Sequence, residues 1–228
     1  MRRDIRNEVL LPLIVLLGLT LLFWLTRVDI YILKPFYNNK EEWFLGNGLL
    51  WILLHKYGSL PGILLGVASL ITLVLSLFVR KFFLYRKAAL FLILSLALGP
   101  GLITNTLLKD HWGRARPMQV KEYGGSEEYT KVWARTDFVD GRSFPSGHAS
   151  IGFFLMTPFF VLRKKKIKWA KAFLIIGLIY GGLMGFGRML QGAHFPSDVV
   201  WAAGIVYFTS LFLAYLFGFY KSDNSQTE

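Results

Sequence analysis

Long apolar runs alternate with short polar segments along the whole chain. Six runs are predicted to span a bilayer, at residues 9–28, 60–79, 88–108, 148–162, 169–186 and 196–220. Most of them approach the ~20 residues that an α-helix needs to cross the hydrocarbon core. The chain is also 54% hydrophobic, which is too apolar for a soluble domain of 228 residues. The pattern predicts an all-α polytopic membrane protein with six transmembrane helices, folded as one domain over residues 1–228.

Three segments depart from this simple pattern. Residues 29–60 mix aromatic and charged side chains, which is typical of a helical segment lying at the membrane interface. The alternative, an extra span over residues 44–54, is disfavoured because that run is too short. A kink is expected at Gly99-Pro100-Gly101. Residues 109–147 form one long extracytoplasmic loop, and the sequence does not predict the fold of its part 121–142.

The basic residues indicate an orientation. If the N-terminus is cytoplasmic, most cations outside the polar motifs fall on the inner side, as the positive-inside rule requires. These residues are Arg2, Arg3, Arg6, Arg80, Lys81, Arg86, Lys87, Arg163, Lys164, Lys165, Lys166, Lys168, Lys171 and Lys221. Six spans then place both termini in the cytoplasm and the polar motifs on the opposite face of the inner membrane.

The net charge and the cysteine content narrow the range of possible binding partners. The net charge of +12 would suggest nucleic acid in a soluble protein, but here the cations lie between apolar spans, so no nucleic-acid partner is expected. The chain has no cysteine, which excludes disulfides and thiolate metal sites. The expected partners are the bilayer and a negatively charged ligand bound by the polar motifs. Neither the identity of that ligand nor the oligomeric state can be predicted.

The first polar motif occupies residues 109–117. It contains Lys109, Arg114 and Arg116, followed by Pro117. Guanidinium groups bind phosphate oxygens in a bidentate way and lysine acts as a compact charge, so the mixture suits a phosphoryl group. The alternative is a set of cations that snorkel from a helix end. The clustering of three cations favours an anion site.

The second motif, residues 145–148, lies where an apolar helix is predicted to begin. The first N–H groups of a helix have no internal partner and the helix dipole favours an anion there. Ser146, Gly147 and His148 could therefore hold a phosphate. The alternative is that Ser146 is only a helix N-cap and His148 an interfacial ring.

The third motif, residues 187–198, offers a nucleophile. Asp198 follows His194 by four residues, so its carboxylate could orient the imidazole through Nδ1–H and leave Nε2 to attack. Arg188 adds a further cation for the anion. A simple hydrogen-bonded pair or half of a metal site is the alternative. Metal is disfavoured because the remaining outward acids and His111 lack the spacing of metal ligands, so no metal or cofactor is expected.

Two histidines beside one phosphate suggest a reaction. Neutral His194 would attack phosphorus, the cations would stabilise the equatorial oxygens, and His148 would protonate the leaving oxygen. A phosphohistidine results, which water hydrolyses after activation by His148. Because one imidazole starts neutral and the other charged, a bell-shaped pH dependence is expected.

These motifs resemble those of the type 2 phosphatidic acid phosphatase superfamily, Lys-x6-Arg-Pro, Pro-Ser-Gly-His and Ser-Arg-x5-His-x3-Asp. All three match in order and spacing, except that Gly187 stands where the family usually has serine. The resemblance implies a six-helix, metal-independent membrane phosphatase. It also implies that His194, His148 and Asp198 are catalytic. The phosphate would be held by Lys109, Arg116, Ser146, Gly147 and Arg188.

The Trp-Gly-Arg sequence before Arg116 is similar to the bacterial envelope branch of the family. That branch includes phosphatases of lipid A, undecaprenyl diphosphate and phosphatidylglycerophosphate. Arg114 and Arg142 would suit a substrate with more than one phosphate. We therefore expect a lipid A 1-phosphatase that also accepts the other two lipids. A lipid phosphotransferase, an undecaprenyl diphosphate phosphatase and, more distantly, an anion transporter are the alternatives.

Overall fold

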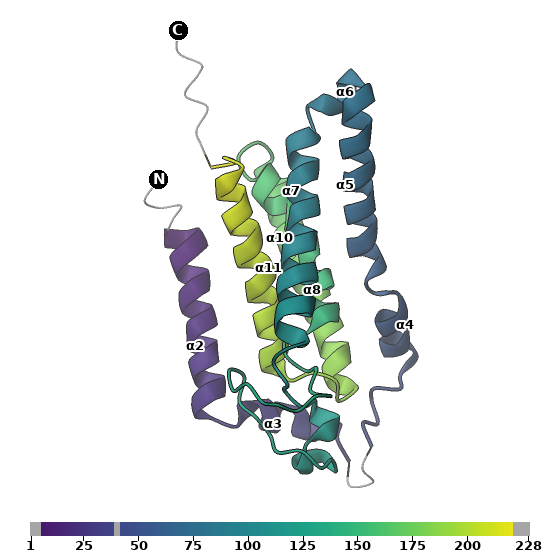
Figure 1. Ribbon diagram of the computed structural model, residues 1–228, viewed down its shortest axis with the longest axis vertical. Helices are drawn as coiled ribbons and strands as arrows, with labels where there is room; N and C mark the ends of the chain where they lie inside the picture. Colours follow the sequence, from purple (N-terminus) through teal and green to yellow (C-terminus); the bar gives the residue numbers. More distant parts are fainter. Residues whose placement is uncertain (1–5, 39–41, 221–228) are drawn as a thin grey trace.

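The computed structural model describes residues 6–38 and 42–220, which form a bundle of helices lying side by side (Figure 1). The described residues contain no strand, only two isolated bridges in the long loop. This confirms the all-α prediction. The basic start with Arg2 and Arg3 and the polar tail from Lys221 lie outside the described residues.

The elements follow one another with short connections, apart from the segments 37–48 and 110–146. The α-helices are α2 (Leu11–Leu25), α3 (Val28–Leu33), α4 (Leu49–Tyr57), α5 (Leu60–Phe78), α6 (Arg80–Phe83), α7 (Arg86–Leu96), α8 (Gly147–Phe153), α9 (Pro158–Leu162), α10 (Ile167–Leu190) and α11 (Pro196–Leu216). π-helices cover η1 (Arg6–Leu10) and η3 (Ala97–Lys109), and 3-10 turns cover η2 (Lys34–Phe36), η4 (Pro117–Gln119), η5 (Lys121–Tyr123) and η6 (Phe154–Met156).

Five helical stretches of the described residues are long and apolar enough to cross a membrane. They are Asn7–Leu25, Leu49–Phe78, Arg86–Lys109, Ile167–Leu190 and Pro196–Leu216. The chain is thus a multi-pass membrane protein. The stretch Gly147–Leu162, predicted as the fourth span, is apolar but shorter, so the count of six spans stays a prediction.

The interfacial segment predicted over residues 29–60 is only partly correct. Its last part is the helix α4, which leads almost directly into α5 and belongs to the same long apolar stretch. Lys56 was one of the charged residues that indicated an interfacial segment, and His55 precedes it. Both lie in the last turn of α4, where basic side chains interact favourably with the negative end of the helix dipole.

The irregularity expected at Gly99-Pro100-Gly101 takes the form of a change in helix type. Helix α7 passes at Ala97 into the π-helix η3, which contains Pro100. The Asn105 side-chain amide donates a hydrogen bond to the Pro100 carbonyl at 2.7 Å. The wider π-helical turn allows the apolar span to continue past a residue that lacks an N–H.

The loop 110–146 is folded against the end of the bundle where α3 lies, at the bottom of Figure 1. Val120 and Val132 are fully buried, and the Tyr123 hydroxyl donates to the Ile30 carbonyl at 2.5 Å. Trp133 packs edge-on against Trp201 of α11, with ring centroids 4.8 Å apart. The loop and α3 thus pack together at the end of the bundle that carries the polar motifs.

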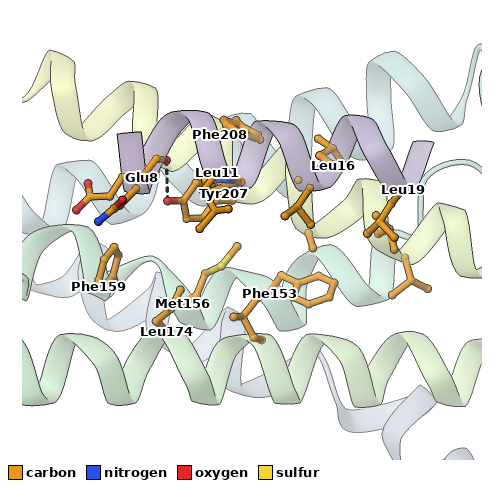
Figure 2. A pocket seen from close by; sticks show the side chains of 18 residues that line it. Glu8, Leu11, Leu16, Leu19, Phe153, Met156, Phe159, Leu174, Tyr207 and Phe208 are labelled. Carbon is orange, nitrogen blue, oxygen red and sulfur yellow. Dashed lines mark hydrogen bonds between the residues drawn. The ribbon is translucent and has the colours of Figure 1, made fainter. Parts of the chain in front are cut away.

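A large groove of the described residues lies away from these motifs. It has a volume of about 620 Å³ and runs between α2 and helices α8, α10 and α11 (Figure 2). Its walls are almost entirely hydrocarbon. Glu8 and Tyr207 lie at one end, where the Tyr207 hydroxyl donates to the Glu8 carbonyl at 2.9 Å. A groove without fixed cations cannot hold a phosphate, so the reaction site must be elsewhere.

Candidate active site

The three polar motifs meet at one end of the bundle. The Ser146 N–H donates to the Asp198 carbonyl at 3.2 Å, which joins the second motif to the third. The Met118 N–H donates to the Gly192 carbonyl at 2.9 Å, which joins the first motif to the third. The ammonium of Lys109, at the end of η3, lies beside Gly147. Motifs up to 89 residues apart therefore form one site.

Gly147 allows this close approach. A Cβ atom at this position would lie 2.5 Å from Oδ1 of Asn105 and 3.3 Å from Nζ of Lys109. The preceding residue, Ser146, is the N-cap of α8, although its hydroxyl is 3.5 Å from the Ala149 nitrogen. That contact lies at the limit of hydrogen-bond length. Ser146 is thus a weak cap, and its binding of phosphate stays a prediction.

His194 is enclosed and held in one tautomer. Its Nδ1 lies 2.7 Å from the Ser143 carbonyl, and a carbonyl can only accept, so Nδ1 carries the proton and Nε2 the lone pair. Only 2% of the side chain is exposed. Burial lowers the pKa of His194 to about 4, against the opposing effect of the Asp198 carboxylate. The imidazole is therefore neutral near pH 7, as a nucleophile must be.

Asp198 does not make the direct hydrogen bond expected from the four-residue spacing. Its Oδ2 lies 3.8 Å from Nδ1 of His194, beyond hydrogen-bond length. Oδ2 instead accepts from the Ser143 hydroxyl at 2.6 Å and from the Phe195 N–H at 2.8 Å. Ser143 thus links the two residues, because its hydroxyl binds the Asp198 carboxylate and its carbonyl binds the His194 imidazole. No pattern in the sequence indicated that Ser143 would link these two residues.

Arg114 cannot contact a substrate, so its predicted role was wrong. The side chain is fully buried and bonded to two carboxylates, Asp198 at 2.5 Å and Asp29 at 2.8 Å. Burial alone would lower the pKa of Arg114, but these carboxylates raise it above its ordinary value. Arg142, by contrast, is exposed and forms an ion pair with Asp110. Contact between Arg142 and a substrate remains a prediction.

Arg116 and Arg188 face a common cavity of about 330 Å³. Its other lining residues are Gly46, Asn47, Ile52, His55, Met118, Gln191 and Ala193. Within the described part of the chain, the Nε–H groups of both arginines are buried without a hydrogen-bond partner. A buried polar group without a partner requires an explanation. An anion in the cavity would supply acceptors for both guanidinium groups.

His148 has a second histidine beside it that the sequence analysis missed. The ring of His55, from α4, packs edge-on against His148 with centroids 5.0 Å apart. Burial, Arg188, His55, His194 and Lys109 all lower the pKa of His148, to about 4, so the free imidazole is neutral near pH 7 and becomes an acid only when a bound phosphate anion raises that pKa. No motif identified His55, because α4 is separated from the polar motifs in sequence and was taken for an interfacial segment. The site therefore contains three histidines.

The departure of Gly187 from the family pattern has a packing reason. A Cβ atom at this position would lie 2.9 Å from Cε3 of Trp51. The indole of Trp51, on α4, thus occupies the space that a serine side chain would need. Across residues 6–38 and 42–220, no cluster of three His, Cys, Asp or Glu side chains could hold a metal ion.

Comparisons with known proteins identify the family of this chain. A family profile described as PAP2 superfamily matches residues 88–222. A lipid A 4'-phosphatase of Francisella tularensis subsp. novicida (strain U112) is 36% identical over 222 residues, covering 92% of this chain and 97% of the relative. A lipid A 4'-phosphatase of Rhizobium leguminosarum is 33% identical over 121 residues, covering 51% of this chain and 50% of the relative.

No solved structure matches the chain. The relatives carry the 4' position in their names, so the expected 1-phosphatase specificity has no support from them. The superfamily profile and the long match to the Francisella phosphatase both cover the three motifs that meet at this site. The chain therefore belongs to the PAP2 superfamily and is a membrane lipid phosphatase, a phosphoric monoester hydrolase.

Proposed function

We propose that this enzyme removes the 4'-phosphate from lipid A through a phosphohistidine on His194, without a metal. This replaces the 1-position expected from the sequence. The observation that carries the mechanism is the fixed Nδ1–H tautomer of a buried, neutral His194 beside a cavity with two unsatisfied guanidinium N–H groups. The names of the relatives support the lipid and the position.

The reaction has two balanced steps. In the first, Nε2 of His194 forms a bond to phosphorus while the bond from phosphorus to the sugar oxygen breaks, and His148 donates a proton to that oxygen. In the second, neutral His148 takes a proton from water as the water oxygen attacks phosphorus and the N–P bond breaks. Inorganic phosphate leaves, and both histidines return to their starting states.

The cations act on the charge that develops at phosphorus. Arg116 and Arg188 bind the equatorial oxygens with Nε–H groups that are already buried and oriented, so little reorganisation is required during the reaction. Lys109, beside Gly147, adds a third positive charge. Ser146 and the first N–H groups of α8 contribute further donors.

The site is proposed to face the periplasm at the inner membrane, with both chain ends in the cytoplasm. The distribution of basic residues supports this orientation. Lipid A presents its phosphates at a membrane surface, and Arg116 and Met118 of the loop 110–146 line the cavity. The phosphate could then enter while the acyl chains remain in the bilayer.

Phosphate release from defined lipids tests this function. The purified enzyme in detergent, with chelator, would be given lipid A phosphorylated only at 4', lipid A phosphorylated only at 1, undecaprenyl diphosphate and phosphatidylglycerophosphate. Release should be fastest from the 4' lipid, survive the chelator and disappear in His194→Ala. Preference for another lipid would overturn the substrate, and full activity of His194→Ala would overturn the mechanism.

A further inference from the structure

A buried ionic cluster joins the N-terminal part of the chain to the catalytic acid. Asp29 of α3 and Asp198 of α11 are both fully buried and share one guanidinium, that of Arg114. Asp29 lies outside the residues that match the family profile, which begins at residue 88. None of the three polar motifs contains it. The reaction as described above does not use it.

Every oxygen of the Asp29 carboxylate is engaged. Oδ1 accepts from the Ser197 N–H at 2.9 Å, and Oδ2 accepts from the Ser197 hydroxyl at 2.6 Å and from Arg114 at 2.8 Å. The Tyr129 hydroxyl donates to Oδ2 at 3.2 Å. Because Ser197 lies in the first turn of α11, Asp29 also places a negative charge at the N-terminus of the helix that carries Asp198.

Arg114 links the position of the Asp29 carboxylate to that of the Asp198 carboxylate. Its Nη2 binds Asp29, while its Nη1 binds Asp198 and the Ser197 hydroxyl, the latter at 2.8 Å. The planar guanidinium keeps a fixed angle between these donors, so fixing one carboxylate fixes the other. The Nε–H of Arg114 donates to the Thr130 carbonyl at 3.1 Å, which further restricts rotation of the guanidinium.

The charges of the cluster also matter for the reaction. Two carboxylates and one guanidinium carry a net charge of about −1. This charge lies close to the imidazole of His194, which becomes cationic when it bonds to phosphorus. The other charged or titratable groups that act on His194 include the cations Lys109 and Arg188 and the imidazole of His148. Without Asp29 the cluster would be neutral, and the cationic imidazole would lose a stabilising charge.

We propose that Asp29 is a positioning residue for catalysis, acting through Arg114 on Asp198 and thereby on His194. The inference rests on the proposed role of His194. It assigns a function to the segment between the first helix and α4. In this enzyme the nucleophile is thus oriented by groups from both ends of the chain.

The test uses Asp29→Asn and Arg114→Lys in the full-length enzyme. Asp29→Asn removes the charge but keeps the size, whereas Arg114→Lys keeps the charge but cannot bind two carboxylates in a fixed geometry. With kcat normalised to sites titrated with orthovanadate, a phosphoryl analogue, both variants should show kcat about 10- to 100-fold lower, with KM changed less than about threefold. Asp29→Asn should also bind orthovanadate about tenfold more weakly.

Asp137→Asn is the matched control, because it makes the same substitution at an exposed residue of the loop 110–146, outside the cluster. Its kcat per titrated site should equal that of the parent. A structural role for Asp29 would lower the melting temperature and the number of active sites, but not kcat per site. If Asp29→Asn does not fold, the kcat per titrated site of Arg114→Lys tests the proposal instead. Parental kcat per site in the folded variant would overturn the proposal.

Failure of this proposal differs from failure of the proposed function. If His194→Ala abolishes phosphate release while Asp29→Asn and Arg114→Lys keep the parental kcat, only the positioning role is wrong. If His194→Ala retains the parental rate, the proposed mechanism is wrong. In that case the orthovanadate affinities of the parent and Asp29→Asn still report whether the cluster acts on anion binding.

Discussion

The two parts of the chain contribute to the active site in different ways. The part that matches the family profile, residues 88–222, carries the predicted reacting groups, among them His148, His194 and Arg188. The N-terminal part contributes no predicted catalytic group, yet Asp29, Trp51 and His55 all lie against the site. The comparison teaches that the motifs define the chemistry, while the N-terminal helices define the surroundings in which it takes place.

The largest effect on activity is expected from removing a predicted phosphate-binding cation in residues 88–222, the part that matches the family profile. Arg188→Ala should lower kcat by about 10²- to 10³-fold, because a preoriented donor to the transition state is lost. Phosphate release from lipid A phosphorylated at 4' measures this change. The exposed loop residue Arg135 provides the control, since Arg135→Ala should stay within about twofold of the parent. Equal effects of both substitutions would contradict a specific role for Arg188.

The pH dependence should report the burial of His194. Because burial lowers its pKa to about 4, the neutral form persists from pH 7 down to about pH 5 and is lost as the pH falls through 4. Titration of ¹⁵N-labelled histidine by NMR, with His194→Gln for assignment, should show an Nδ1–H tautomer that protonates near pH 4. A midpoint near the ordinary value of 6.5, or an Nε2–H tautomer, would contradict the geometry.

A smaller effect is expected from the histidine contributed by the N-terminal part. His55→Ala should raise KM about 3- to 10-fold, the effect of one net hydrogen bond, and change kcat less. The physical reason is that His55 lines the cavity and touches His148, while the proposed proton transfer belongs to His148. Steady-state kinetics on lipid A separate the two constants. A fall in kcat as large as that of His148→Ala would make His55 a catalytic residue.

The smallest effect on activity should come from restoring the serine of the family pattern. Gly187→Ser places a side chain against Trp51 and should destabilise the protein by about 1–3 kcal/mol through overpacking, with kcat within about twofold of the parent. Thermal unfolding in detergent measures the loss. Adding Trp51→Phe replaces the indole with a smaller ring that lacks Cε3 and should recover most of the stability. If the double variant is no more stable than Gly187→Ser, Trp51 is not the cause.

The helices and the motif residues could be predicted because their signals are local. Apolar runs such as residues 86–109 and 196–216 need no knowledge of their neighbours to indicate a span. The histidine and acid of the third motif lie four residues apart and lead directly into α11. In these cases the sequence separation is short, so the pattern indicates which residues lie near one another, although Asp198 and His194 do not form the expected direct hydrogen bond.

The surroundings of the site could not be predicted because they depend on long-range contacts. Asp29 and Ser197 are 168 residues apart, and nothing near Asp29 in sequence indicates a buried acid. Arg114 was assigned to the substrate because a cation beside a phosphate motif resembles a ligand-binding residue, whereas two distant carboxylates bury it. His55 was missed because it lies outside the three motifs, in a segment that was expected at the membrane interface.

The most direct test of the account is to trap the covalent intermediate. Lipid A labelled with ³²P at the 4' position would be mixed with enzyme for milliseconds, quenched in alkali and digested, and the labelled peptide identified. The account predicts an alkali-stable, acid-labile phosphohistidine at His194, formed in the presence of chelator and absent in His194→Ala. Label on another residue, or full phosphate release with no labelled protein at any time, would contradict it.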